Sequence, residues 1–156
     1  MITQYDITLA VPSDAIAIAE LSRDAIEHGL SWRWTTRRVA RSIRDIATNA
    51  IVARQRNSFV GFAIMKYEET EAHLLLLAVP PAHRRRGVAS AMLDWLEPTV
   101  RAAGITTVQL ETRKRNQAAV EFYRHHGFED AGIFPGYYEG VEDALRMVKD
   151  MSRGVG

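Results

Sequence analysis

Apolar residues recur with two periods along this chain, and the periods predict its strands and helices. Alternation or continuous apolar runs indicate strands over residues 5–11, 50–54, 59–67, 72–79, 106–113, 128–134 and 144–151. Spacings of three and four indicate helices that begin at Ser13, at Thr35 or Thr36, near Gly87 and at Gln117. The order β-α-α-β-β-β-α-β-α-β-β predicts an α/β (α+β) fold with a mixed sheet.

Polar and glycine residues at the element ends set the expected boundaries. Ser13, which follows Pro12, is the expected N-cap of the first helix. The buried stripe of the second helix is expected to continue through Ile46 to Ala50. Glycines stop the last two helices, at Gly104 and Gly127.

The most informative stretch lies between the fourth strand and the third helix. Residues 74–79 form a continuous apolar run, which predicts a fully buried strand, and two prolines end it. Three arginines and Gly87 then lead into a helical pattern. The first N–H groups of a helix have no intrahelical acceptor and favour an anion, and small residues at Gly87 and Ala89 let one approach. The amides of residues 85–90 therefore predict a pyrophosphate-binding turn, although an ordinary turn with solvated arginines would have the same pattern.

A second block of polar residues lies on the fifth strand and the fourth helix. Glu111 points away from the apolar face formed by Val108 and Leu110. Asn116 is placed to cap the next helix, and Tyr123 lies two turns along it. Each residue also has a structural interpretation: Glu111 as a solvated strand residue, and Tyr123 as core packing.

Composition limits the possible functions. A chain of 156 residues without a linker fits one domain, expected over 1–152 with a short tail at 153–156. A net charge of +1 argues against a dedicated nucleic-acid binder. The absence of cysteine excludes disulfides, thiolate zinc sites and acyl-cysteine intermediates. We expect no metal, no signal peptide, no membrane partner and a cytoplasmic monomer or homodimer.

Two motifs resemble a known family. The pattern V-x-P-x-x-R-x-x-G-x-G/A, read as Val79, Pro81, Arg84, Gly87 and Ala89, resembles the acyl-CoA-binding signature of the GCN5-related N-acetyltransferases. Asn116 and Tyr123, followed by Gly-Phe, resemble the second cofactor motif, and the stretch looks most like the ribosomal-protein alanine N-acetyltransferase branch. The resemblance implies that fold, acetyl-CoA as co-substrate, and direct transfer of an acetyl group to a primary amine.

The resemblance also implies roles for individual residues. Glu111 would be the general base, acting through water, and Tyr123 would protonate the departing CoA thiolate. Backbone N–H groups near Ala78 and Val79 would donate to the oxyanion of the tetrahedral intermediate. The implied cofactor-binding residues lie at the strand end, in the turn and on the fourth helix: Leu77, Ala78, Val79, Arg84, Arg85, Arg86, Gly87, Val88, Ala89, Ser90, Asn116 and Tyr123.

The acceptor stays open at this point. A protein or peptide α-amine, with a pKa of about 7.7–8.0, is far more often neutral than a lysine near 10.4, so a single water-linked carboxylate can suffice for it. A small-molecule amine is the alternative, and a non-catalytic acyl-CoA-binding module is a third hypothesis. In the family the loop around Trp32 and Trp34 borders the acceptor cleft, and one of the two is expected to pack in the core.

Overall fold

The computed structural model describes residues 5–152, so the expected tail at 153–156 lies outside the described residues. The predicted order of elements is confirmed. The strands are β1 (Asp6–Leu9), β2 (Thr48–Gln55), β3 (Ser58–Tyr67), β4 (Glu71–Ala78), β5 (Thr107–Arg113), β6 (Glu129–Tyr138) and β7 (Glu142–Asp150). The α-helices are α1 (Ala15–Leu21), α2 (Thr36–Arg44), α3 (Val88–Ala102) and α4 (Gln117–His125).

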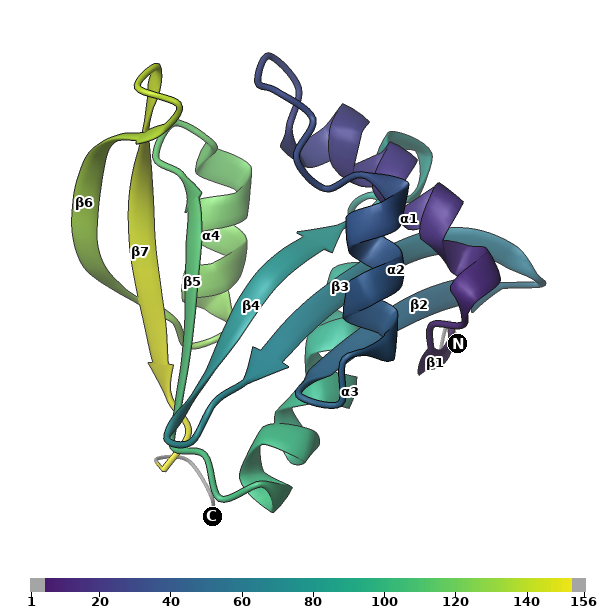
Figure 1. The fold of residues 1–156 in the computed structure, drawn as a ribbon. Helices are drawn as coiled ribbons and strands as arrows, with labels where there is room; N and C mark the ends of the chain where they lie inside the picture. The colour runs from purple at the N-terminus through teal and green to yellow at the C-terminus, as the bar shows by residue number, and fades with distance from the viewer. Residues whose placement is uncertain (1–4, 153–156) are drawn as a thin grey trace. The chain divides into compact units, whose positions relative to one another are not determined.

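The strands form one mixed sheet in the order β1-β2-β3-β4-β5-β7-β6 (Figure 1). The β4–β5 pair is parallel, whereas β1–β2, β2–β3, β5–β7 and β6–β7 are antiparallel. The chain divides into two compact units. The first unit holds the residues up to Lys66 together with Leu75–Pro98, and the second holds Tyr67–Leu74 and the residues from Thr99 onward.

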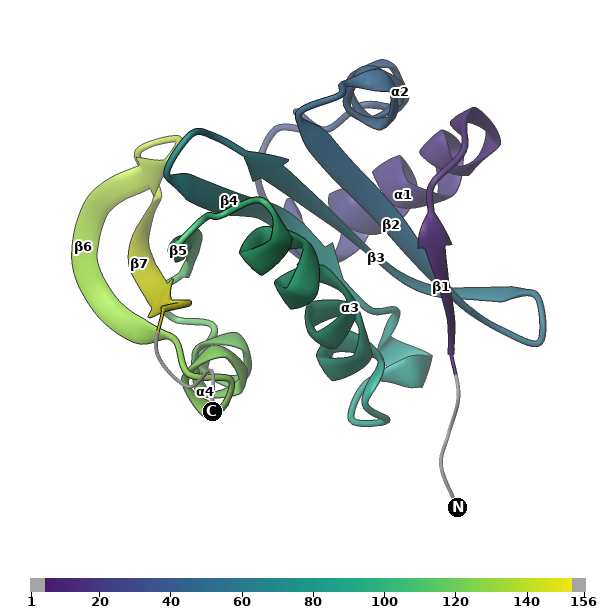
Figure 2. The same ribbon diagram turned by 90° about the horizontal axis from the view of Figure 1, so that it is seen from below.

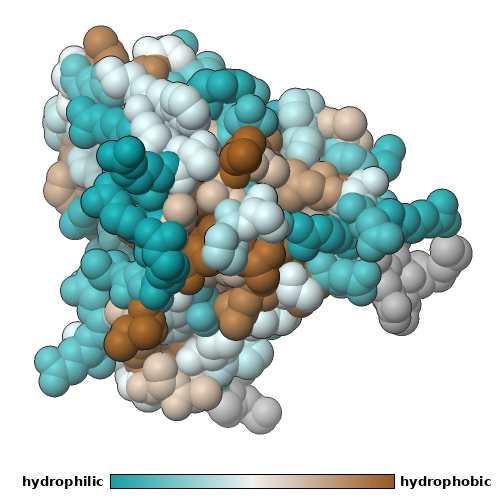
Figure 3. Space-filling view, turned by 45° about the vertical axis from the view of Figure 1, so that its right-hand side comes forward, coloured by the Kyte–Doolittle hydropathy of each residue, from teal (hydrophilic) through white to brown (hydrophobic). Residues whose placement is uncertain are grey.

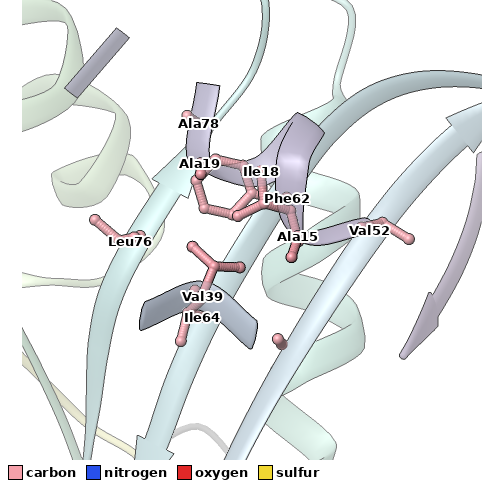
Figure 4. Packing of buried hydrophobic residues seen from close by; sticks show 10 residues of the cluster. Ala15, Ile18, Ala19, Val39, Val52, Phe62, Ile64, Leu76 and Ala78 are labelled. Atoms are coloured by element: carbon pink, nitrogen blue, oxygen red, sulfur yellow. The ribbon is translucent and has the colours of Figure 1, made fainter. Parts of the chain in front are cut away.

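In the first unit, the central strands are buried on both faces. Helices α1 and α2 cover one face of β2 and β3, and α3 lies on the other (Figure 2). Consecutive residues of β3, from Val60 to Met65, are therefore all buried. Phe62 is fully buried and packs with Ile18 of α1 and Val39 of α2 (Figure 4). These contacts across the sheet fix the positions of β3 and the end of β4.

In the second unit, burial alternates along the strands. The beginning of β4 pairs with β5 through His73 opposite Gln109, and β5 pairs with β7 through Glu111 opposite Arg146. Along β5, Val108 and Leu110 are buried, and the residues between them are only half-buried. The predicted orientation of Glu111, opposite to the apolar face of its strand, is confirmed.

Two expectations about element ends are wrong. The Asp14 carboxylate, not Ser13, accepts the hydrogen bond from the Val11 N–H at the first helix (2.9 Å), because a 3₁₀ turn over Pro12–Asp14 precedes α1. Helix α2 ends at Arg44, because the Asp45 carboxylate bonds the Ala47 N–H (3.0 Å) and the Thr48 hydroxyl (2.9 Å).

The early end of α2 places Ile46 in a loop, where its side chain is fully exposed, and Ala50 in β2 instead of on the helix.

The predicted full burial of residues 74–79 is wrong for two residues of the run. Leu75 and Leu77 are half-buried, because burial alternates along β4 and only one of its faces lies fully in the core.

The surface is mixed. The face drawn in Figure 3 is mostly hydrophilic, with apolar side chains interspersed. Large exposed apolar side chains of the described residues include Ile16, Ile46 and Val141. Within residues 5–152, no helix is both long enough and apolar enough to cross a membrane.

Replacing Phe62 with alanine should lower the free energy of unfolding by about 3–5 kcal/mol, because the change leaves a cavity between the sheet and two helices. Urea denaturation followed by circular dichroism measures the loss. Ile46→Ala, at a fully exposed side chain, should change stability by less than about 0.5 kcal/mol. Equal losses in the two variants would contradict this account of the core.

Candidate active site

The turn after β4 has a defined backbone conformation in the first unit. A 3₁₀ turn over Pro81–His83 follows the strand, and Arg84 Nε donates to the Val79 carbonyl (3.1 Å). Arg85 then adopts a positive φ of 62° and Gly87 one of 85°. The Tyr5 hydroxyl donates to the Arg86 carbonyl (2.7 Å). These bonds use carbonyl oxygens of the turn, and the His83 and Arg84 N–H groups donate to the carbonyls of Pro80 and Pro81.

Helix α3 begins where this turn ends. The Ala91 N–H donates to the Gly87 carbonyl (3.0 Å), so the amides of Gly87, Val88 and Ala89 precede the first hydrogen bond of the helix. A Cβ at Gly87 would meet no atom of the chain within 4 Å, so the space beside these amides is open. Ser90 follows in the first turn of the helix. The predicted turn therefore fits a pyrophosphate group, whose charge the helix N-terminus favours.

The end of β4 is held close to β3 by a glycine. A Cβ at Gly61 would come within 3.1 Å of the Ala78 carbonyl and 3.2 Å of Val88, so no larger residue fits there without a shift. Ala78 and Val79 are buried, and Leu77 is half-buried. Gly61 was not singled out from the sequence, although a glycine inside a strand is a known sign of close backbone approach.

Glu111 is bound on both carboxylate oxygens in the second unit. Its Oε1 lies 2.7 Å from His73 Nε2, and its Oε2 accepts from Arg146 Nε at 2.7 Å. Only 6% of the Glu111 side chain is exposed. Burial raises the pKa of Glu111, but the hydrogen bonds from His73 and Arg146 outweigh it and lower the pKa below its usual value. Glu111 is thus held as a carboxylate.

Tyr123 is a buried phenol on α4. Its ring packs edge-on against Phe122 and Phe128, with centroid distances of 5.2 and 5.5 Å, so the core-packing interpretation also holds. Burial, and to a lesser degree the neighbouring Tyr138, raise its pKa well above the usual value. The group stays protonated at neutral pH and can donate its proton. Asn116 caps α4, as predicted, by accepting the Ala119 N–H (3.2 Å).

Residues of β6 and β7 also surround Glu111. Burial, and then the charge of Glu111, raise the pKa of Tyr137. Arg146 lies over the Phe134 ring at 4.3 Å. The sequence did not single out His73 or Arg146 as site residues, and a strand register would have been needed to find them. The structure brings His73, Glu111 and Arg146 together.

The basic segment at residues 113–115 is only partly available for an anion. Arg113 pairs with Glu142 at 2.5 Å. Lys114 and Arg115, together with the Glu142 side chain, line an open pocket of about 380 Å³. The Arg115 side chain is 82% exposed. Within the described ranges, no group of three histidine, aspartate or glutamate side chains could hold a metal ion.

The loop before α2 depends on a buried carboxylate that the sequence analysis did not identify. Glu27 Oε1 accepts the Arg33 N–H (2.7 Å) and the Trp34 N–H (3.1 Å), and its Oε2 accepts from the Ser22 hydroxyl (2.7 Å). Trp34 packs against the core, and the guanidinium carbon of Arg38 lies over its ring, 3.9 Å from the ring centroid. Trp32 is 39% exposed and donates to the Ala19 carbonyl (3.2 Å). Core packing by one of the two tryptophans is thus confirmed.

Glu111→Gln should destabilise the fold at neutral pH and much less in acid. Because folding lowers the pKa of Glu111, its charge stabilises the fold above the unfolded pKa of about 4.3, and this contribution is lost as the pH falls through the lower folded pKa. Urea unfolding of wild type and variant between pH 7 and the acid limit of folding should therefore give converging stabilities. Glu121→Gln, at an exposed position on α4, is the control, and a constant gap for Glu111→Gln would contradict the pairing.

Comparisons with known proteins agree with this geometry. The model of the acetyltransferase (GNAT) family matches residues 17–128. The [ribosomal protein bS18]-alanine N-acetyltransferase of Escherichia coli K12 is 36% identical over 101 residues, which cover 63% of this chain and 68% of the relative.

Two solved structures extend the likeness to nearly the whole chain. Ard1 from Thermoplasma volcanium has a TM-score of 0.84 at 28% identity, over 94% of this chain and 97% of that one. The paia N-acetyltransferase from Thermoplasma acidophilum, solved in complex with coenzyme A, has the same fold. Its TM-score is 0.78 at 18% identity, over 95% of this chain and 99% of that one. The chain belongs to the acetyltransferase (GNAT) family, and it is an N-acetyltransferase that uses acetyl-CoA as its acetyl donor.

Proposed function

We propose that this enzyme transfers the acetyl group to the α-amine of a protein or peptide N-terminus. The observation that carries acetyl-CoA binding is the open turn at Gly87, where a Cβ would meet no described atom within 4 Å and the amides of Gly87, Val88 and Ala89 precede the first hydrogen bond of α3. The acceptor half is supported by the 36% identity to an enzyme named for an N-terminal substrate class, the alanine of a ribosomal protein. We further propose that it acts as a monomer or homodimer in the cytoplasm, without nucleic acid or membrane.

The reaction requires two proton movements. The amine must lose a proton to attack the thioester, and the thiolate must gain one as it leaves. An α-amine needs little help with the first movement, because an appreciable fraction is already neutral near pH 7, given a reference pKa of about 7.7–8.0. A lysine side chain, with a reference pKa near 10.4, is neutral far less often and would need more help from a base.

We assign the remaining roles to the residues that the motifs identify. The turn amides of Gly87, Val88 and Ala89 hold the pyrophosphate, and the main chain of Ala78 and Val79 donates to the oxyanion. Glu111 is part of the general base, and Tyr123 is the general acid that protonates the thiolate. The raised pKa of Tyr123 supports this role, because the phenol remains protonated until the thiolate forms.

An acceptor screen tests the proposed function. Purified protein and acetyl-CoA are mixed with peptides that begin with alanine, with the same peptides blocked at the N-terminus but containing lysine, and with polyamines and aminoglycosides, and thiol release is followed. Acetylation of the free N-termini alone is the expected result. Preference for a small amine would support the alternative substrate class, and binding without any transfer would leave an acyl-CoA-binding module.

Gly87→Glu should abolish measurable binding of coenzyme A, because the carboxylate would fill the open space and repel the phosphates. Gly87→Ala is the matched control, since both variants carry the strain of a side chain at a φ of 85°, which costs about 1–2 kcal/mol. Isothermal titration calorimetry with coenzyme A, with thermal unfolding in parallel, separates the two effects. Equal affinities of the Glu and Ala variants would remove this turn from the cofactor site.

Tyr123→Phe should lower kcat by about 10²–10⁴-fold with little change in the affinity for acetyl-CoA, because it deletes the proton donor and keeps the buried ring. Single-turnover measurements ensure that the chemical step is observed. Tyr138→Phe is the comparison, since burial also raises the pKa of Tyr138. A large loss in Tyr138→Phe with an active Tyr123→Phe would transfer the role of the acid to Tyr138.

A further inference from the structure

The environment of Glu111 raises a question about where the proton of the amine goes. Glu111 Oε2 accepts from Arg146 Nε at 2.7 Å, Oε1 lies 2.7 Å from His73 Nε2, and only 6% of the side chain is exposed. A proton on this carboxylate would remove the negative charge that pairs with Arg146. Glu111 alone is therefore an unfavourable final site for the proton.

The neighbours of Glu111 differ in their ability to accept a proton. Arg146 cannot, because a guanidinium has no acceptor site and stays charged. Tyr137 and Tyr138 are protonated at neutral pH, since burial raises the pKa of both. Among the described groups bonded to the carboxylate, this leaves the imidazole of His73.

The strand register aligns these side chains on one face of the second unit. His73 lies opposite Gln109 on the β4–β5 pair, and Arg146 lies opposite Glu111 on the β5–β7 pair. Glu71, the other charged residue on this face of β4, is occupied by a bond from Gln109 Nε2 (3.0 Å). The His73 side chain is 22% exposed, compared with 6% for Glu111, so water reaches the imidazole more readily than the carboxylate.

We propose that His73 and Glu111 act as one proton-accepting pair, in which the imidazole takes the proton of the acceptor amine and the carboxylate orients and stabilises it. This inference rests on the proposed function. In this pair the Nε2–H tautomer of His73 donates to Glu111 Oε1, at the observed distance of 2.7 Å, and its Nδ1 lone pair receives the amine proton through water. The imidazolium then releases that proton to solvent, while the amine nitrogen keeps its new bond to the acetyl carbon and the thiolate is protonated separately.

Arg146 has a supporting role in the pair. It bonds the second oxygen of Glu111 and keeps the carboxylate charged, so that the negative charge faces His73 when the imidazolium forms. The arrangement follows the logic of a histidine held by a buried carboxylate, in which the carboxylate orients the ring without itself taking the proton.

Chemical rescue tests the pair. With an alanine-initiated peptide as acceptor, His73→Ala should lower the single-turnover rate by about 10²-fold or more without changing the KM for acetyl-CoA. Added imidazole should raise the rate of His73→Ala by about tenfold or more. Pyrazole, a ring of the same size but a far weaker base, should restore none. His125→Ala, at an exposed histidine at the end of α4, should behave as wild type.

A second substitution separates proton transfer from positioning. His73→Gln can still offer an N–H to Glu111 but has no basic nitrogen, so it should be as slow as His73→Ala. Near-wild-type rates in His73→Gln, rescue by pyrazole equal to that by imidazole, or full activity in His73→Ala would each overturn the pair.

Failure of the pair and failure of the proposed function give different results. Wild-type protein that acetylates no α-amine overturns the proposed function and the role of the pair with it. Wild-type protein that is active and insensitive to His73 substitution overturns the pair alone. Circular dichroism checks that each variant is folded. If His73→Ala does not fold, the rate of His73→Gln decides the test.

Discussion

A helix that starts at a left-handed residue is the constraint on which the proposed pyrophosphate-binding turn depends. Gly87 turns the chain at a φ of 85°, and the amides of Gly87, Val88 and Ala89 precede the first hydrogen bond of α3, from the Ala91 N–H to the Gly87 carbonyl. Two side-chain hydrogen bonds hold the turn: the Arg84 side chain donates to the Val79 carbonyl, and the Tyr5 hydroxyl donates to the Arg86 carbonyl. The main chain therefore presents its donors without needing a side chain to do so.

The Glu111 cluster of the second unit depends on charges placed across neighbouring strands. One carboxylate lies between an imidazole and a guanidinium, each contributed by a different strand. A position on a half-buried strand face makes these bonds stronger than they would be in water and makes an unpaired Glu111 costly.

Local features of this fold could be predicted from the sequence, and distant pairings could not. The turn at Gly87, the Asn116 cap and the orientation of Glu111 each follow from residues close together in the chain. The partners of Glu111 are 38 and 35 residues away, and only the strand register places them. The errors at Ser13 and Ile46 have a shared cause: a neighbouring aspartate side chain bonded the main chain and moved the boundary of the helix.

The buried carboxylate of Glu27 has a consequence for how this enzyme can change. It bonds the main-chain N–H groups of two successive loop residues, and every residue except proline has such a group. The loop before α2 can therefore keep its anchor while the side chains at positions 33 and 34 are replaced. Divergence of the loop sequence among related chains need not mean divergence of the loop backbone.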